Sequence, residues 1–147
     1  MSDRTVSNTP LLDFSDKKLL QPIPSNLHEL ASSYFTNNEL DLLQIAHSVA
    51  SEAHKNQVRQ EGSPYITHPI AVASILLELH LDVETVCAGL MHDVLEDSII
   101  QKSYLEKLFG KETLVIVDGV SNLNKLDFDS LEDRNANNLQ KMALAMS

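Results

Sequence analysis

Residues 90–97 read LMHDVLED and combine a helical apolar pattern with four ionisable side chains. The apolar positions Leu90, Met91, Val94 and Leu95 recur at the spacing of one buried helix face. The others are a histidine and three carboxylates, and carboxylates held close together repel one another. Such a segment is stable mainly where a cation, a proton or a basic partner is present, and a divalent metal ion would supply that charge.

On one continuous helix, the four ionisable residues would form two adjacent columns. His92 is followed four residues later by Glu96, and these two side chains share a face. Asp93 is followed at the same spacing by Asp97, so all four side chains can face one cleft. The imidazole of His92 and the carboxylate of Asp93 form a mixed donor set that suits Mn, Fe or Zn better than Ca.

A metal site needs a third ligand, and His68 is the best candidate. It lies near the end of the loop RQEGSPYITHP, residues 59–69, where Gly62 and two prolines interrupt helix. A side chain at a loop-to-helix junction can be aimed into a cleft by the rigid structure around it. The alternative is that His68 only caps its helix and that residues 92–97 form a solvated face, and the spacing alone leaves both open.

The chain from residue 38 onward has the periodicity of amphipathic helices. Capping residues and prolines mark where the first three of these helices begin. The three are a helix over 39–58 capped by Asn37 or Asn38, a helix with Pro69 at its first position, and a helix capped by Asp82 that carries residues 90–97.

The later part of the chain continues this pattern. YLEKLFG predicts a helix closed by Gly110, and DRNANNLQKMALAMS predicts one that starts near Asp133. Residues 113–120, TLVIVDGV, fit a strand or a helix, and a helix is preferred because nothing nearby resembles a pairing strand. The fold class that follows is all-α, a helical bundle.

Residues 1–37 differ in composition, with three prolines and many Ser, Asn and Asp residues. Their apolar pairs keep no long period, which predicts an N-terminal extension, mostly irregular, with short helical turns at most. A chain of 147 residues that is 43% hydrophobic suits a single domain, placed here at 38–147.

The formal net charge is −10, and Lys and Arg form no run, which argues against a nucleic-acid groove or an anionic membrane surface as partner. No apolar run approaches the ~20 residues of a membrane span, and the N-terminus lacks the pattern of a secretory signal. The single cysteine, Cys87, cannot form an internal disulfide, and its expected role is packing. These features predict a cytoplasmic protein.

Three stretches together resemble the N-terminal hydrolase domain of the RelA/SpoT proteins, which metabolise the alarmone (p)ppGpp. They are AHKNQVRQEGSPYITHPIAVASIL (53–76), HDVLEDS (92–98) and LFGKETLVIVDGVSNLNKL (108–126), in the family's order and spacing. The resemblance runs from about residue 40 to the last residue. It implies an all-helical bundle of the HD superfamily that binds Mn²⁺ and removes the 3′-pyrophosphate of (p)ppGpp, giving GDP or GTP.

Carried over by motif, the resemblance implies roles for individual residues. His68, His92 and Asp93 would be the metal ligands. Glu96 and Asp97 would position and activate the attacking water or orient the metal-bound species. The resemblance further implies that a nucleotide substrate is contacted by Arg59. A bound cation and this arginine would together offset the charge of the pyrophosphate, which an acidic protein otherwise repels.

The chain departs from the family pattern in two respects that matter for activity. Gln60 stands where the family often has a second basic residue, so one contact to substrate is expected to be missing. The chain also stops inside a predicted helix, before the family's Ala-Asp-Arg-like motif, whose aspartate is the fourth metal ligand. The sequence therefore predicts a bundle incomplete at its C-terminus, with weak metal binding and poor or absent hydrolysis by this chain alone.

Other functions and residue roles stay open at this stage. Three functions stay open. The chain is the (p)ppGpp hydrolase domain at the N-terminal end of a bifunctional synthetase/hydrolase, or an HD phosphohydrolase that acts on another nucleotide. The third alternative is a catalytically silent module that regulates or binds a partner. His47 and His54, seven residues apart on the first long helix, are expected to be solvated or hydrogen-bonded rather than a metal pair. Tyr65 either stacks on a base or packs its loop onto the bundle.

Overall fold

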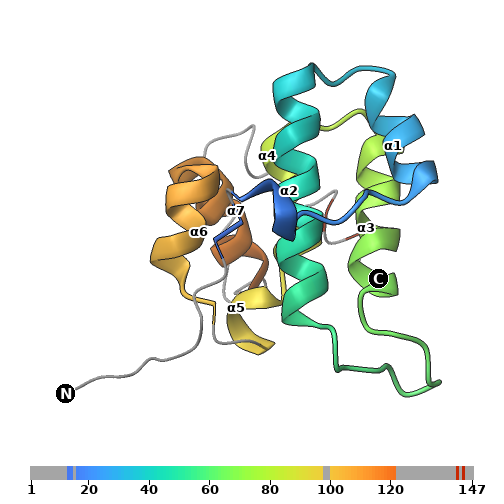
Figure 1. Cartoon of the computed structure of the whole chain (residues 1–147). Helices are drawn as coiled ribbons and strands as arrows, with labels where there is room; N and C mark the ends of the chain where they lie inside the picture. The colour runs from blue at the N-terminus through green and yellow to red at the C-terminus, as the bar shows by residue number, and fades with distance from the viewer. Residues whose placement is uncertain (1–12, 15, 98–99, 122–141, 143, 145–147) are drawn as a thin grey trace.

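The computed structural model describes residues 13–14, 16–97, 100–121, 142 and 144. These residues form helices and no extended strand, so the predicted all-α fold is confirmed for this part of the chain (Figure 1). In chain order the elements are η1 (Lys17–Leu19), α1 (Ser25–Ser32), α2 (Asn37–Ala53), α3 (Thr67–Glu78), α4 (Val83–Met91), α5 (Val94–Asp97), α6 (Lys102–Phe109) and α7 (Lys111–Ser121).

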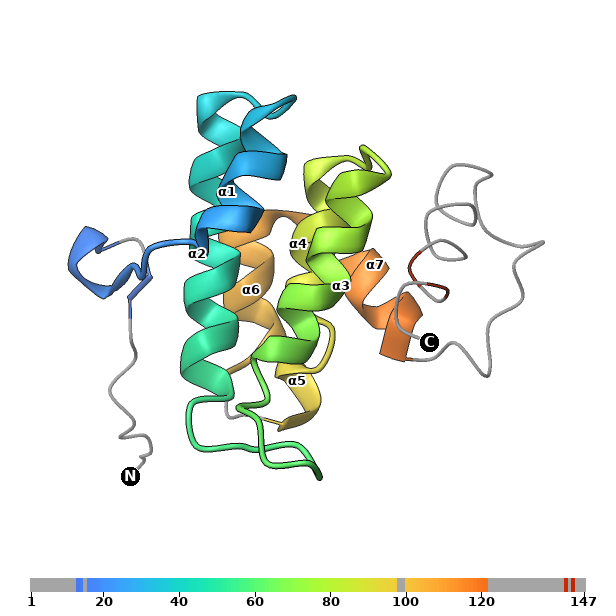
Figure 2. The same cartoon turned by 90° about the vertical axis from the view of Figure 1, so that its right-hand side faces the viewer.

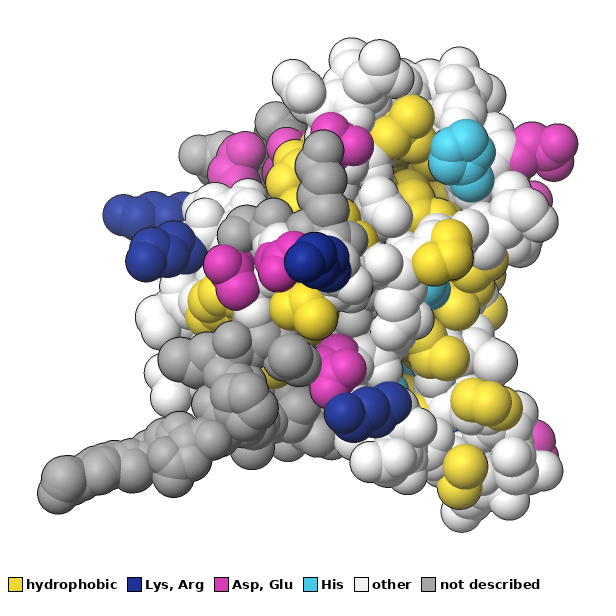
Figure 3. All heavy atoms as spheres, viewed as in Figure 1, with side chains coloured by type: hydrophobic (Ala, Val, Ile, Leu, Met, Phe, Trp, Pro, Cys, Tyr) yellow, Lys and Arg dark blue, Asp and Glu magenta, His cyan; other side chains and the backbone are white. Residues whose placement is uncertain are grey.

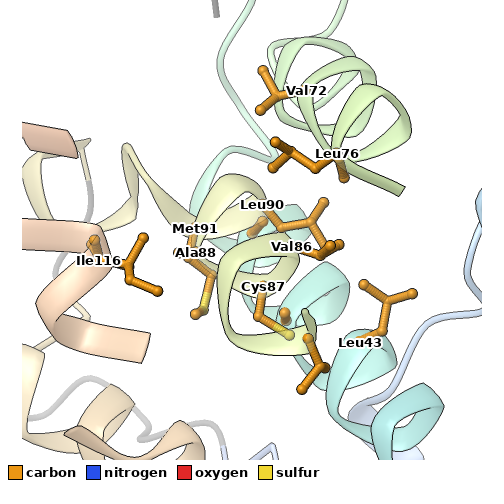
Figure 4. Close-up of a cluster of buried hydrophobic side chains, with 14 of the residues drawn as sticks. Leu43, Val72, Leu76, Val86, Cys87, Ala88, Leu90, Met91 and Ile116 are labelled. Carbon is orange, nitrogen blue, oxygen red and sulfur yellow. The ribbon is translucent and has the colours of Figure 1, made fainter. Parts of the chain in front are cut away.

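Helix α4 is the centre of the bundle and packs against α2, α3 and α7 (Figure 2). All of its residues except Glu84 are buried, because partner helices surround it. Figure 4 shows Leu43 of α2, Leu76 of α3 and Ile116 of α7 around the helix α4. A fully buried leucine contributes about 1.5–3 kcal/mol, so this contact set is a main source of stability.

The segment before residue 38 contributes more to the core than the sequence predicted. It contains η1 and the eight-residue helix α1, whose Leu27 and Ala31 are completely buried. Phe14 is also buried, and its backbone N–H donates to the hydroxyl of Tyr104 over 2.8 Å. The expectation of short helical turns at most was wrong, because the apolar pair four residues apart packs α1 against α3.

Helix α2 begins at Asn37, two residues before the predicted start at 39, and its N-cap is Thr36 rather than Asn37 or Asn38. The Thr36 hydroxyl accepts from the backbone N–H of Glu39 at 3.2 Å, and the Glu39 carboxylate accepts from the Thr36 N–H at 2.9 Å. This reciprocal capping box satisfies two N–H groups at once and fixes the start. The helix ends at Ala53, before the predicted end at 58.

The remaining helix predictions have mixed outcomes. Asp82 caps α4 as predicted, and its carboxylate accepts from the Thr85 N–H at 2.9 Å. Pro69 is the third residue of α3, not the first, since the helix already begins at Thr67. Residues 113–120 belong to α7, which confirms helix over strand. The helix predicted to start near Asp133 lies outside the described residues.

The surface agrees with the absence of a basic run in the sequence. On the face seen in Figure 3, the described lysine and arginine side chains lie among acidic ones and form no basic stripe. No helix in the described part of the chain has the length and apolar composition needed to cross a bilayer.

The burial of His47 in α2 predicts how the stability of the folded chain depends on pH. His47 is only 5% exposed, and its Nδ1 has no hydrogen-bond partner among the described residues. Burial lowers the pKa of His47 in the folded chain. The folded state therefore binds fewer protons here than the unfolded state, so this contribution to stability is complete above the unfolded pKa of about 6.5 and is lost as the pH falls below it.

We accordingly expect the free energy of unfolding to fall less between pH 7.5 and 5.5 in His47→Gln than in the parent chain. Urea unfolding at a series of pH values measures this difference. The same change at the exposed His28 controls for the loss of a histidine from the sequence. Parallel pH dependences in the parent chain and in His47→Gln would contradict the assignment.

Candidate metal centre

Three of the predicted site residues converge at one end of the bundle. His68 comes from the first turn of α3, His92 follows the last residue of α4, and Asp93 precedes α5. Each offers one ligand atom, and these atoms all lie within 4.8 Å of one another. The loop between α2 and α3 lies at the same end of the molecule as α5, as both ribbon views show (Figure 1, Figure 2).

The chain does not follow one helix through residues 90–97. Helix α4 ends at Met91, His92 and Asp93 form a turn, and α5 starts at Val94. The His92 ring nitrogen Nδ1 lies 2.7 Å from the Gly89 carbonyl oxygen, and so competes for the acceptor that residue 93 would use in an unbroken α-helix. The prediction of one continuous helix was therefore wrong, and the two donors lie at a junction between helices.

The His92–Gly89 hydrogen bond also determines which ring nitrogen can bind a metal. Because the Gly89 carbonyl can only accept, Nδ1 of His92 carries the proton and Nε2 faces the cluster. That Nε2 lies 3.1 Å from Asp93 Oδ2. A nitrogen lone pair and a carboxylate oxygen at this distance repel each other unless a cation lies between them, either a proton on Nε2 or a metal ion. The donor set therefore fits a divalent metal.

Charge at the other two residues favours the metal-binding forms. Burial would raise the pKa of Asp93, but the contacts of its carboxylate with His92 and Tyr65 and the nearby His68 outweigh this effect and bring the pKa to about 2. Burial lowers the pKa of His68, and His92 and Arg59 lower it further against the opposing effect of Asp93. At neutral pH the site thus presents a carboxylate and a neutral imidazole, the states that coordinate metals.

Arg59 lies in the loop between α2 and α3, close to the cluster. Its backbone N–H donates to the Ser63 carbonyl over 2.8 Å, and the turn between them uses Gly62 at φ 100°, a conformation that favours glycine. The Arg59 guanidinium carbon lies 5.9 Å from the centre of the Tyr65 ring, and its Nε lies 3.6 Å from Glu61 Oε2. The side chain is 36% exposed and can therefore reach a ligand in solution.

Tyr65 contacts the metal cluster through a hydrogen bond that the sequence did not predict. Its hydroxyl donates a hydrogen bond to Asp93 Oδ2, which joins the α2–α3 loop to the metal cluster. The sequence suggested only base stacking or loop packing, and the spacing between the two residues gives no signal of this contact. The Tyr65 ring also lies against His54, which is 2% exposed, at 4.6 Å between ring centres.

Two predicted residues lie only partly within the described structure. The backbone of Glu96 and Asp97 belongs to α5, one turn after the cluster, and their side chains lie outside the described part. Their catalytic roles stay predictions. His47 and His54 are not among the three grouped residues.

The sequence model of the HD domain matches residues 46–147, which include all three clustered residues. The chain belongs to the HD-domain family. HD domains bind divalent metals, and the cluster of His68, His92 and Asp93 is a possible site in this one.

Relatives of this HD domain include enzymes of alarmone metabolism. The chain is 45% identical over 121 residues to the bifunctional (p)ppGpp synthase/hydrolase SpoT of Escherichia coli, an alignment that covers 82% of this chain and 17% of that protein. It is 50% identical over 99 residues to the guanosine-3′,5′-bis(diphosphate) 3′-pyrophosphohydrolase of Haemophilus influenzae, covering 67% of the chain and 15% of the relative.

The GTP pyrophosphokinase of Myxococcus xanthus is 36% identical over 141 residues, which is 94% of this chain and 19% of that protein. The aligned part of the chain thus spans less than a fifth of the length of each of these three relatives.

Proposed function

We propose that this chain is the hydrolase domain of a (p)ppGpp 3′-pyrophosphohydrolase, which converts ppGpp or pppGpp to GDP or GTP and releases pyrophosphate. The observation that carries the proposal is the convergence of His68, His92 and Asp93 within 4.8 Å in a chain with the HD-domain match. The names of the Escherichia coli and Haemophilus influenzae relatives support this substrate.

Mn²⁺ is the proposed cofactor, held by these three residues. When bound, the metal lowers the pKa of a coordinated water and offsets the charge of the pyrophosphate. The mixed imidazole and carboxylate donors suit such an ion. The Gly89 carbonyl supports this role, because it fixes the proton of His92 on Nδ1 and leaves Nε2 directed toward the cluster.

Three further residues near the cluster have proposed roles in binding and hydrolysis. Glu96 and Asp97, one turn beyond the ligands, are proposed to orient the attacking water and accept its proton. Arg59 is proposed to bind the anionic nucleotide, since its exposed guanidinium is a cation near the cluster in a chain of net charge −10.

The proposed setting is the cytoplasm, with a small nucleotide as the partner rather than nucleic acid or a membrane. The synthetase activity named for the Escherichia coli relative would reside in sequence outside the aligned region, so bifunctionality is part of the proposal. The division into an extension of 37 residues and an HD domain from residue 38 also stays a prediction.

The test is a single-turnover assay, with the chain in excess over ppGpp so that even slow cleavage is measured. We expect release of pyrophosphate and GDP to require Mn²⁺ and to fall to the background rate in Asp93→Asn. GTP and GDP, which lack the 3′-pyrophosphate, are the control nucleotides.

Two results would contradict the proposal in different ways. Metal binding without any ppGpp cleavage would favour the silent-module alternative. Faster cleavage of a nucleotide without a 3′-pyrophosphate would instead identify an HD phosphohydrolase with another substrate.

A further inference from the structure

We propose that Tyr65 is a positioning residue of the metal centre, which holds the Asp93 carboxylate in the orientation that the metal requires. The inference rests on the proposed metal site. Tyr65 is not one of the three ligands, and it reaches them from the loop between α2 and α3 through its hydroxyl.

Asp93 needs such support because it lies in the turn between α4 and α5 rather than inside a helix. Its Oδ2 accepts the hydrogen bond of the Tyr65 hydroxyl and lies 3.1 Å from Nε2 of His92. One contact comes from the residue directly before Asp93, and the other comes from 28 positions earlier. Together they restrict the rotation of the carboxylate, so its ligand atom is oriented before metal arrives.

The position of Tyr65 is itself fixed from two directions. Its backbone N–H donates to the Gln57 carbonyl over 2.9 Å. Its ring packs at 4.6 Å on His54, whose own Nδ1 lies 3.0 Å from the Gln57 side-chain oxygen. Because His54 is 2% exposed, it is a rigid support beneath the ring.

The Tyr65 ring and hydroxyl have separate contacts, which makes the proposal testable. The ring lies beside Arg59, at 5.9 Å from the guanidinium carbon, and has an edge contact with His68 at 6.1 Å between ring centres. Tyr65→Phe keeps the ring and removes the hydroxyl that donates to Asp93. A change in metal binding by this variant is therefore attributable to the hydroxyl.

The experiment measures Mn²⁺ affinity by isothermal titration calorimetry, with the metal alone and no nucleotide. We expect Tyr65→Phe to bind Mn²⁺ about 10–100-fold more weakly than the parent chain, the usual effect of losing a partner of a ligand. With Co²⁺ as the probe, its visible absorption spectrum should also change, because the carboxylate reorients.

Tyr34→Phe is the matched control. The Tyr34 hydroxyl also donates a partly buried hydrogen bond, to the Leu81 carbonyl at 2.6 Å. None of the described interactions of Tyr34 involves the three ligands. Its Mn²⁺ affinity and Co²⁺ spectrum should match those of the parent chain. For a destabilised variant, the unfolding midpoint with Mn²⁺ is compared with the midpoint of the same variant without metal. The rise between the two still reports metal binding.

The outcomes separate this inference from the proposed function. Equal Mn²⁺ affinities and Co²⁺ spectra for Tyr65→Phe and the parent chain would overturn the role of Tyr65 and leave the metal site intact. A parent chain that binds neither metal would overturn the metal site, and the role of Tyr65 with it. Equal losses in Tyr65→Phe and Tyr34→Phe would assign the effect to general destabilisation and also reject the proposal.

Discussion

Replacing His92 with asparagine is expected to remove measurable Mn²⁺ binding, a larger loss than the ~10–100-fold expected for a residue that only supports a ligand. His92 is 4% exposed and is held by the Gly89 carbonyl, so its Nε2 cannot be replaced by a neighbouring side chain without rearrangement of the turn. Asparagine is too short to reach the same point, and its amide is a weaker donor than imidazole for such a metal.

Calorimetric titration with Mn²⁺ measures the effect of this substitution, and circular dichroism shows whether the helices persist. The loss of the buried bond to Gly89 alone should lower stability by only about 1 kcal/mol, so the variant should remain folded. His47→Asn is the control, because it removes another buried histidine that is not part of the cluster. Retention of the parent affinity by His92→Asn would reject His92 as a ligand.

Gly89→Val is expected to lower the free energy of unfolding by about 2–3 kcal/mol, the upper part of the usual range for overpacking a core. A Cβ at this position would lie 2.7 Å from Cδ1 of Leu76 and 3.3 Å from Cγ1 of Val72, both buried residues of α3. The absence of a side chain therefore allows α3 and α4 to approach closely. Urea unfolding measures the loss, and Ser103→Val, at an exposed position of α6, controls for a β-branched residue in a helix.

A double-mutant cycle isolates the close approach itself. Gly89→Ala introduces the Cβ that meets Leu76, and Leu76→Val removes the Cδ1 atom that it would meet. The double variant should be more stable than the sum of the single effects by at least about 0.5 kcal/mol. Simple additivity would show that the contact with Leu76 is not the source of the constraint.

Features set by neighbouring residues were the ones that the sequence predicted well. Asp82 was recognised as a cap because a capping residue directly before an apolar run is a local signal. The capping box of Thr36 and Glu39 was equally local, a threonine followed three residues later by a glutamate, and was missed although the sequence contains it. His68, His92 and Asp93 were grouped by motif, and the structure brings them close together, while their role as metal ligands stays a prediction.

Features that depend on tertiary contacts could not be predicted in this way. The apolar period continues across residues 92 and 93, so periodicity alone could not reveal the break that accompanies the His92–Gly89 bond. Helix α1 was missed because its stability comes from burial of Leu27 and Ala31 rather than from a long pattern. The bond from Tyr65 to Asp93 joins residues 28 positions apart and has no sequence signature.

Gly89 has two separate structural roles, one through its missing side chain and one through its backbone carbonyl. Its missing side chain sets how near α3 can come to α4, while its carbonyl oxygen sets the protonation of His92. A larger residue here would push α3, which carries His68, away from α4, whose last residue precedes His92. The close packing of α3 on α4 and the hydrogen bond that orients His92 therefore meet at the same residue of the bundle.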